Sequence, residues 1–184
     1  MVKTHIFLVG PMGAGKSSVG KSLAKTLKRP FLDLDSEIER RTGADIQWIF
    51  DMDGEDGFRD RESKIFSQII EEKKCAVIAT GGGLVLKKEN RKLLASSGIV
   101  IYLFASKEQL IQRTKRDKKR PLLQVEDRAK VISEILDQRD PLYREVADIV
   151  FKSGSGHLSK TVKKLADKLE GDQNLAKVCK KNNQ

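Results

Sequence analysis

The chain has 184 residues, of which 39% are hydrophobic, and a formal net charge of +10. This length and composition indicate one globular domain and exclude wholesale disorder, and no apolar run approaches the roughly 18 residues that span a membrane. Two cysteines are too few for a disulfide framework, and the first residues show no signal-type cleavage site. We therefore expect a cytoplasmic protein without a membrane partner, whose charge attracts an anionic ligand.

The positive charge is concentrated in two segments. Residues 107–120 contain seven Lys and Arg against two acidic residues, and residues 152–184 contain eight Lys against three. A charge run is usually a solvated face, and neither segment has the interleaved aromatic residues that are typical of nucleic-acid binding. We expect no nucleic-acid partner.

Predicted strands and helices alternate along the chain. Short apolar runs predict strands at residues 5–9, 30–35, 75–80, 99–104 and 147–151. Helical periodicity predicts helices at residues 17–27, 36–41, 45–52, 55–73, 87–97, 106–116, 126–145 and 158–169. This order predicts an α/β fold in which helices cover both faces of a parallel sheet, with one domain over 1–170 and a polar tail over 171–184.

A phosphate-binding loop follows the first predicted strand. Its sequence, G-P-M-G-A-G-K-S from Gly10 to Ser17, matches the pattern G-x-x-x-x-G-K-[ST] between a strand and a helix. The glycines let backbone N–H groups face the phosphates, Lys16 reaches the outer phosphates, and the Ser17 hydroxyl ligates Mg²⁺. The loop predicts binding of ATP or GTP with Mg²⁺ and leaves the phosphoryl acceptor open.

Two carboxylates end the second predicted strand. Asp33 and Asp35 are two positions apart, so on a strand they face the same side, at the edge where open α/β sheets bind ligands. One of them could assist Mg²⁺ through water, and the other could accept a proton from the acceptor hydroxyl. The alternative is that Asp35 or Ser36 caps the next helix.

Two arginines are candidates for binding an anionic acceptor. Arg59 lies near the start of the helix predicted over 55–73, where the helix dipole disfavours a cation, so it could bind a substrate carboxylate or pair with Glu55 or Glu62 on the surface. Arg139 lies in the helix predicted over 126–145, where neighbouring aspartates could simply pair with it.

A glycine triplet and a basic loop complete the candidate site. Gly81, Gly82 and Gly83 follow the third predicted strand, and close approach of a ligand to bare backbone explains three consecutive glycines. Residues 112–125 are basic and contain Pro121, which predicts a lid that closes over the phosphates, with Arg120 neutralising charge on the transferred group. A solvated loop is the alternative.

In this order, the motifs resemble the shikimate kinases, small P-loop kinases of chorismate and aromatic amino acid biosynthesis. The resemblance extends from about residue 5 to 170 and is carried by G-P-M-G-A-G-K-S, L-D-L-D-S-E-I-E, F-D-M-D-G-E-D-G-F-R-D-R-E, A-T-G-G-G, R-T-K-R-D-K-K-R-P-L-L and R-D-P-L-Y. It implies ATP-dependent phosphorylation of shikimate to shikimate 3-phosphate, a substrate-binding segment over about 35–62, and a five-stranded sheet of order 2-3-1-4-5. We also expect a monomer.

The resemblance implies a role for each candidate residue. The ATP phosphates would be bound by Gly13, Ala14, Gly15, Lys16, Ser17 and Ser18. Ser17 would ligate Mg²⁺, with Asp33 assisting through water. The acceptor would be bound by Asp35 as candidate base, by Arg59 and Arg139 at its carboxylate, and by backbone of Gly81, Gly82 and Gly83. Arg120 would contact ATP and the transferred group, and Arg113 would flank the adenine. The loop over 152–157 lacks the Arg or Pro frequent in the family, so backbone near Ser155 would contact the adenine instead.

Three other functions compete with this interpretation. A gluconate kinase shares the P-loop and can share the two aspartates, but the glycine triplet and F-R-x-x-E motif argue against it. A nucleoside monophosphate kinase needs a base-reading pocket, for which the sequence shows no signal. A nucleic-acid-binding NTPase would explain the charge but not the missing recognition motif.

Overall fold

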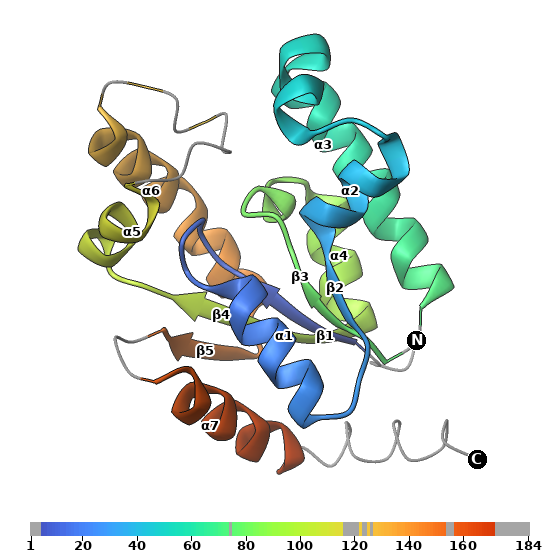
Figure 1. Cartoon of the computed structure of the whole chain (residues 1–184), viewed down its shortest axis with the longest axis vertical. Coiled ribbons are helices and arrows are strands. Elements are labelled where there is room, and N and C mark those ends of the chain that lie inside the picture. The colour runs from blue at the N-terminus through green and yellow to red at the C-terminus, as the bar shows by residue number, and fades with distance from the viewer. Residues whose placement is uncertain are drawn as a thin grey trace.

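The computed structural model describes residues 5–73, 75–115, 122, 125, 127–153 and 157–171. Its centre is a sheet of five strands: β1 (His5–Val9), β2 (Phe31–Asp33), β3 (Val77–Ala79), β4 (Gly98–Phe104) and β5 (Ile149–Lys152). All strand pairs are parallel and the order is β2-β3-β1-β4-β5 (Figure 1), which confirms the expected fold class and strand order.

Helices cover both faces of the sheet. On one face, α1 (Lys16–Thr26) packs against α7 (Leu158–Glu170), and on the other lie α3 (Ile46–Glu72), α4 (Lys88–Ser97) and α6 (Arg128–Val146) (Figure 1). Alternation along β1 divides the core, because Ile6 and Leu8 join the α1 and α7 side while Phe7 and Val9 join the other. The smaller elements are α2 (Leu34–Thr42), the 3₁₀ helix η1 (Leu84–Leu86) and α5 (Lys107–Thr114).

The end of the second strand differs from its prediction. The sequence predicts a strand over 30–35, but β2 ends at Asp33 and α2 begins at Leu34, so Asp35 lies in the first turn of a helix. The reason is local capping: the Asp33 side chain accepts a hydrogen bond from the Ser36 backbone N–H at 3.4 Å. The helix cap is therefore Asp33, and the alternative that Asp35 or Ser36 caps the helix is wrong.

A glycine interrupts the longest helix. The two helices predicted over 45–52 and 55–73 form α3, which is broken at Gly54, where φ is 71° and ψ is −177°. This backbone region is accessible essentially only to glycine, so the break is encoded by the residue itself. It sets Glu55 at the start of the second part of α3. The 3₁₀ helix η1, directly after the glycine triplet, was not predicted.

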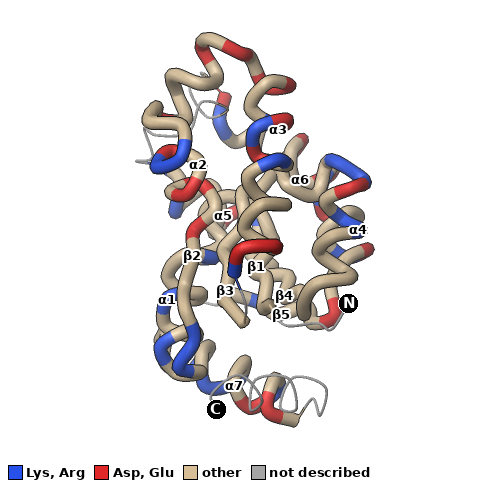
Figure 2. Tube along the Cα trace, turned by 90° about the vertical axis from the view of Figure 1, so that its right-hand side faces the viewer, with Lys and Arg blue, Asp and Glu red and all other residues tan. Residues whose placement is uncertain are grey.

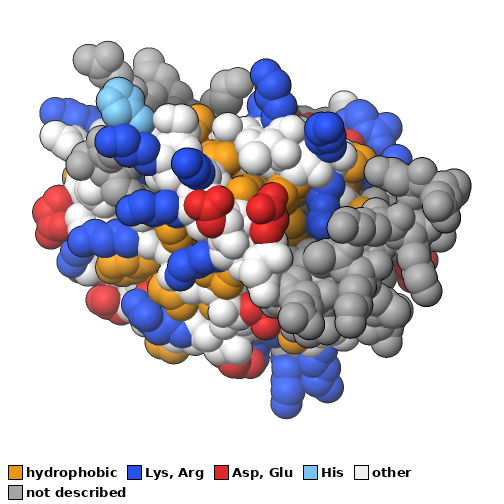
Figure 3. Space-filling view, turned by 90° about the horizontal axis from the view of Figure 1, so that it is seen from below, with side chains coloured by type: hydrophobic (Ala, Val, Ile, Leu, Met, Phe, Trp, Pro, Cys, Tyr) orange, Lys and Arg blue, Asp and Glu red, His pale blue; other side chains and the backbone are white. Residues whose placement is uncertain are grey.

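The surface charge agrees with a solvated helix face on α7. Exposed lysines recur along this helix, at Lys160, Lys163, Lys164 and Lys168, and further basic residues lie along α1 (Figure 2). Seen from the α7 side, the Lys and Arg side chains are interspersed with acidic and apolar ones and do not form one continuous patch (Figure 3). Within the described part of the chain, no helix is both long and apolar enough to cross a bilayer.

Candidate active site

The phosphate-binding loop connects β1 to α1. Gly13 and Gly15 have φ of 77° and 90°, left-handed conformations that let the loop curl back on itself before the helix begins at Lys16. The Lys16 ammonium group is buried and donates to the carbonyls of Gly10 and Pro11 at 2.8 and 2.9 Å. The predicted loop is thus formed, with its lysine held inside the curl.

Two further polar side chains meet next to this loop. The Ser17 hydroxyl donates to Asp33 Oδ2 at 2.6 Å, which joins the start of α1 to the end of β2. A cavity of about 130 Å³ lies here, lined by Gly13, Gly15, Lys16, Ser17, Ser18, Asp33, Asp35 and Thr80. Both aspartates therefore face one cavity as expected, although Asp35 reaches it from a helix and not from a strand.

A second pocket adjoins the first and holds the predicted acceptor residues. It is lined by Met12, Asp35, Ile46, Phe50, Phe58, Arg59, Glu62, Gly81, Gly82, Gly83, Leu122 and Arg139. Arg59 comes from α3 and Arg139 from α6, and both are buried, with 8% and 4% of their surface exposed. The fold thus brings together two arginines that are far apart in the sequence. Asp35 is the one described residue that lines both cavities.

Glu62 is a site residue that the sequence did not identify as functional. Its Oε2 accepts from Arg59 Nη1 at 2.8 Å, and its side chain is only 1% exposed, so the expected surface pair is in fact buried. Burial raises the pKa of the Glu62 carboxyl, the Arg59 guanidinium opposes this rise, and Asp35 adds to it. Two signals were available: the spacing of three residues from Arg59 on a helix, which predicts contact but not burial, and the F-R-x-x-E motif, whose glutamate is Glu62.

The glycine triplet makes room for these side chains. A Cβ on Gly81 would lie 2.2 Å from Glu62 Oε1, and one on Gly83 would lie 2.2 Å from Arg59 Cζ. A Cβ on Gly82 would meet its nearest neighbours at 3.6 Å, an ordinary contact. Two of the three glycines are therefore required by the protein's own side chains, a reason that is additional to the expected approach of a ligand.

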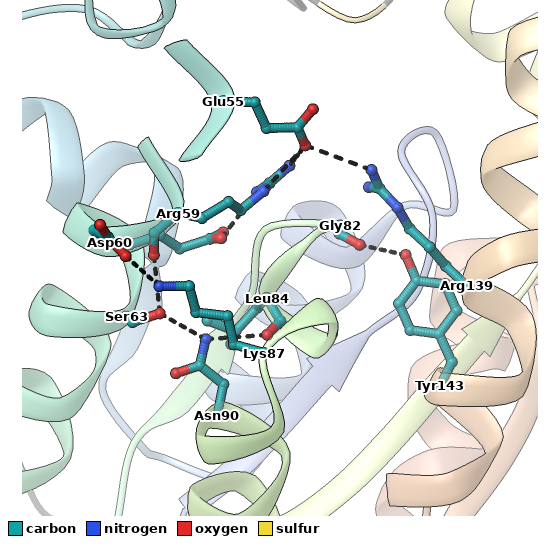
Figure 4. A network of polar contacts seen from close by, with 11 residues as sticks. Glu55, Arg59, Asp60, Ser63, Gly82, Leu84, Lys87, Asn90, Arg139 and Tyr143 are labelled. Carbon is teal, nitrogen blue, oxygen red and sulfur yellow. Dashed lines mark hydrogen bonds and ion pairs between the residues drawn. The ribbon is translucent and has the colours of Figure 1, made fainter. Parts of the chain in front are cut away.

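A tyrosine and an asparagine hold the glycine loop in place. The Tyr143 hydroxyl donates to the Gly82 carbonyl at 2.5 Å (Figure 4), and burial raises the pKa of Tyr143, so it remains a donor at neutral pH. On the other side of the loop, Asn90 Nδ2 donates to the Leu84 carbonyl at 3.1 Å and to Ser63 Oγ at 2.9 Å. The sequence did not identify either residue, because neither contact is local.

The nucleotide side is partly described. Arg113 Nη1 donates to the Gly13 carbonyl and to Ser153 Oγ, both at 3.2 Å, which places this arginine between the phosphate-binding loop and the end of β5. Arg120 and Ser155 lie outside the described residues, as do residues 116–121, 123, 124 and 126 of the region around the predicted lid and residues 172–184 of the tail. From the lid segment, Leu122 lines the acceptor pocket.

Comparison with known proteins places this geometry in a family. The family model for shikimate kinase matches residues 12–170. A shikimate kinase of Francisella tularensis subsp. holarctica is 49% identical over 167 residues, covering 90% of this chain and 95% of the relative. The solved structure of shikimate kinase from Acinetobacter baumannii in complex with shikimate is 46% identical, covers 93% of this chain and 95% of that chain, and has a TM-score of 0.89. A gluconokinase structure from Sinorhizobium meliloti is 17% identical over 94% of this chain and 98% of that chain, with a TM-score of 0.53, and shares the fold alone.

Proposed function

The chain belongs to the shikimate kinase family, and we propose that the two adjoining cavities transfer the γ-phosphoryl group of ATP to a hydroxyl of shikimate. The products are shikimate 3-phosphate and ADP. The observation that carries the proposal is Asp35, which lines both the cavity at the phosphate-binding loop and the pocket that holds Arg59 and Arg139. A hydroxyl held by Asp35 would lie where the two substrates meet.

The acceptor pocket suits a small, polyhydroxylated carboxylate. Two buried guanidinium groups can bind a carboxylate through paired hydrogen bonds, a geometry that lysine reproduces poorly. The backbone of the glycine triplet and the Asp35 carboxylate provide polar partners for hydroxyl groups, while Phe50 and Phe58 line an apolar wall. Six of the residues over 35–62 line the pocket, in support of the role of this stretch as the substrate-binding segment.

Catalysis by these residues would rest on positioning and charge neutralisation. Asp35 would orient the attacking hydroxyl and accept its proton, and backbone N–H groups of the loop from Gly13 to Ser18, including Ala14, would hold the phosphates. Lys16 would exchange its contacts with the loop carbonyls for the transferred phosphate oxygens. We assign Arg113 to the adenine side because it joins the phosphate-binding loop to Ser153 at the end of β5, where the loop expected to contact the adenine begins. Arg120 and Ser155 keep their predicted roles at the transferred phosphate and the adenine.

Ser17 and Asp33 fit a magnesium site. Mg²⁺ takes one or two protein oxygens and fills its remaining positions with water and substrate phosphates, and these two side chains present oxygens 2.6 Å apart beside the phosphate cavity. We expect Ser17 Oγ to ligate the ion directly and Asp33 to hold it through water. When bound, the ion would offset the charge of the phosphate oxygens.

The decisive experiment measures ADP release from ATP with a panel of acceptors: shikimate, gluconate and nucleoside monophosphates. We expect release that depends on shikimate and on Mg²⁺, and background release with the other acceptors. Turnover of gluconate or a nucleotide without turnover of shikimate would refute the proposal. We also propose that the enzyme is a monomer, which light scattering of the eluted protein would check.

A further inference from the structure

A third acidic residue contacts the two arginines of the acceptor pocket. Glu55 Oε1 accepts from Arg59 Nη2 at 2.9 Å and from Arg59 Nε at 3.3 Å. The same oxygen lies 3.9 Å from Arg139 Nη2, so one carboxylate bridges α3 and α6 (Figure 4). Asp53, two residues earlier, pairs instead with Arg61 at 2.6 Å, so this bridge is specific to Glu55.

Glu55 occupies the edge of Arg59 that a carboxylate ligand would use. Arg59 Nη1 is directed to Glu62, while Nε and Nη2 form the second donor edge of the guanidinium and both point to Glu55 Oε1. Paired binding of a carboxylate requires two N–H groups on one edge. A substrate carboxylate that uses this edge must therefore displace Glu55.

The other arginine needs an anion in the same place. Arg139 is buried, and within the described part of the chain its Nε has no hydrogen-bond partner. Burial lowers the pKa of Arg139, the neighbouring Arg59 adds to this effect, and Glu55 opposes it. Two buried like charges are costly without a counter-charge, and Glu55 provides one for both.

The two glutamates beside Arg59 differ in how easily they can leave. The Glu62 side chain is 1% exposed and packs directly against Gly81, whereas the Glu55 side chain is 41% exposed. When Glu55 is released from Arg59, its carboxylate returns to water and is fully solvated. Release of Glu62 would instead leave a buried carboxylate without its ion-pair partner. Glu62 is thus a fixed positioning residue, and Glu55 is a displaceable one.

We propose that Glu55 is a built-in substitute for the acceptor carboxylate, which holds Arg59 and Arg139 together until the acceptor displaces it. This inference depends on the proposed function, because it takes the two arginines to be the acceptor's carboxylate site. Its consequence is selectivity. An acceptor that carries a carboxylate replaces the ion pairs that it breaks, whereas an uncharged polyol cannot replace them and leaves Glu55 in place on the two arginines.

Glu55→Gln tests the proposal, because glutamine keeps the shape and a hydrogen-bond acceptor but removes the charge. Binding is measured by fluorescence of Trp48, the single tryptophan of the chain, which lies between the pocket residues Ile46 and Phe50. We expect the Kd for shikimate to fall by about 3- to 10-fold, a change of the size that the net contribution of one hydrogen bond produces. The Kd for the methyl ester of shikimate, which cannot replace the ion pairs, should change less than twofold.

Two further variants test whether a change in Kd comes from displacement of Glu55. One tests for a general effect of charge on this helix, and the other for an effect peculiar to the glutamine side chain. Asp53→Asn removes the same charge from the same helix without touching either pocket arginine, and should leave both Kd values unchanged. Glu55→Ser, which shortens the side chain, should tighten shikimate binding in the same direction as glutamine if displacement is the cause. Thermal unfolding of each variant verifies that it is folded.

Three results would overturn the proposal. Weaker or unchanged shikimate binding by Glu55→Gln would mean that Glu55 only positions Arg59. Equal tightening for the acid and the ester would mean a general loosening of the pocket. Absence of shikimate binding by both wild type and variant would refute this inference together with the proposed function, whereas wild-type ADP release with shikimate tests the proposed function by itself.

Discussion

Gly83→Ala is expected to impair acceptor binding by displacing Arg59. The backbone of Gly83 has φ of −101° and ψ of −3°, which alanine adopts without strain, so the effect of the added methyl is purely steric. That methyl would lie 2.2, 2.3 and 2.4 Å from Cζ, Nη2 and Nη1 of Arg59. Relief of this overlap requires the guanidinium to move by about 1 Å.

The magnitude follows from the contacts that this movement breaks. Arg59 Nη1 lies 2.8 Å from Glu62 and Nη2 lies 2.9 Å from Glu55, so a shift of that size misaligns the group that binds the acceptor carboxylate. Loss of a charged hydrogen bond costs about 1.5–3 kcal/mol, which corresponds to a rise of roughly 10- to 150-fold in the KM for shikimate. The KM for ATP should stay within about twofold, because the phosphate cavity does not include Gly83.

The assay is steady-state ADP release with each substrate varied in turn, together with thermal unfolding. Alanine in place of glycine also restricts the unfolded chain, which offsets about 0.4–1 kcal/mol of any steric cost, so we expect Tm to change by only a few degrees. Gly171→Ala is the matched control, because its Cβ would meet nothing closer than 3.7 Å. An unchanged KM for shikimate in a folded Gly83→Ala enzyme would refute the placement of the acceptor carboxylate on Arg59.

Two further predictions concern the arginines and the pH dependence of stability. Arg59→Ala and Arg139→Ala should each raise the KM for shikimate by about 100-fold and the KM for ATP far less, and equal effects on both constants would indicate a structural role. Burial lowers the pKa of His5 below 6.5, so the unfolded chain binds this proton at a higher pH than the native chain does. The free energy of unfolding should therefore fall as the pH drops below about 6.5. Denaturant titrations should show a weaker fall in His5→Gln and the full fall in a variant of the exposed His157, and identical slopes in all three proteins would contradict this assignment.

The phosphate-binding loop was predictable because its determinants are consecutive in the chain. Glycines that adopt positive φ, a lysine and a hydroxyl at fixed spacing define a local structure, and the fold has it where the sequence predicts it. The order of strands and helices was predictable for the same reason, since hydrophobic periodicity reports which face of each element is buried. The end of β2 was predicted wrongly because the Asp33 cap competes with strand extension within a few residues.

The acceptor pocket shows where this local information ends. The sequence alone determined the fold class and the loop for the phosphates, because each depends on neighbours along the chain. The assignment of the candidate residues to the pocket came from the resemblance to the shikimate kinases. Only the tertiary structure decided that Glu62 is buried beneath Arg59 while Glu55 stays half exposed, although both lie within about one helical turn of that arginine. Burial depends on what packs against a helix from distant segments, here the loop after β3 and the side chains of α6. Spacing can therefore predict which carboxylates reach an arginine, but not which of them is free to leave it.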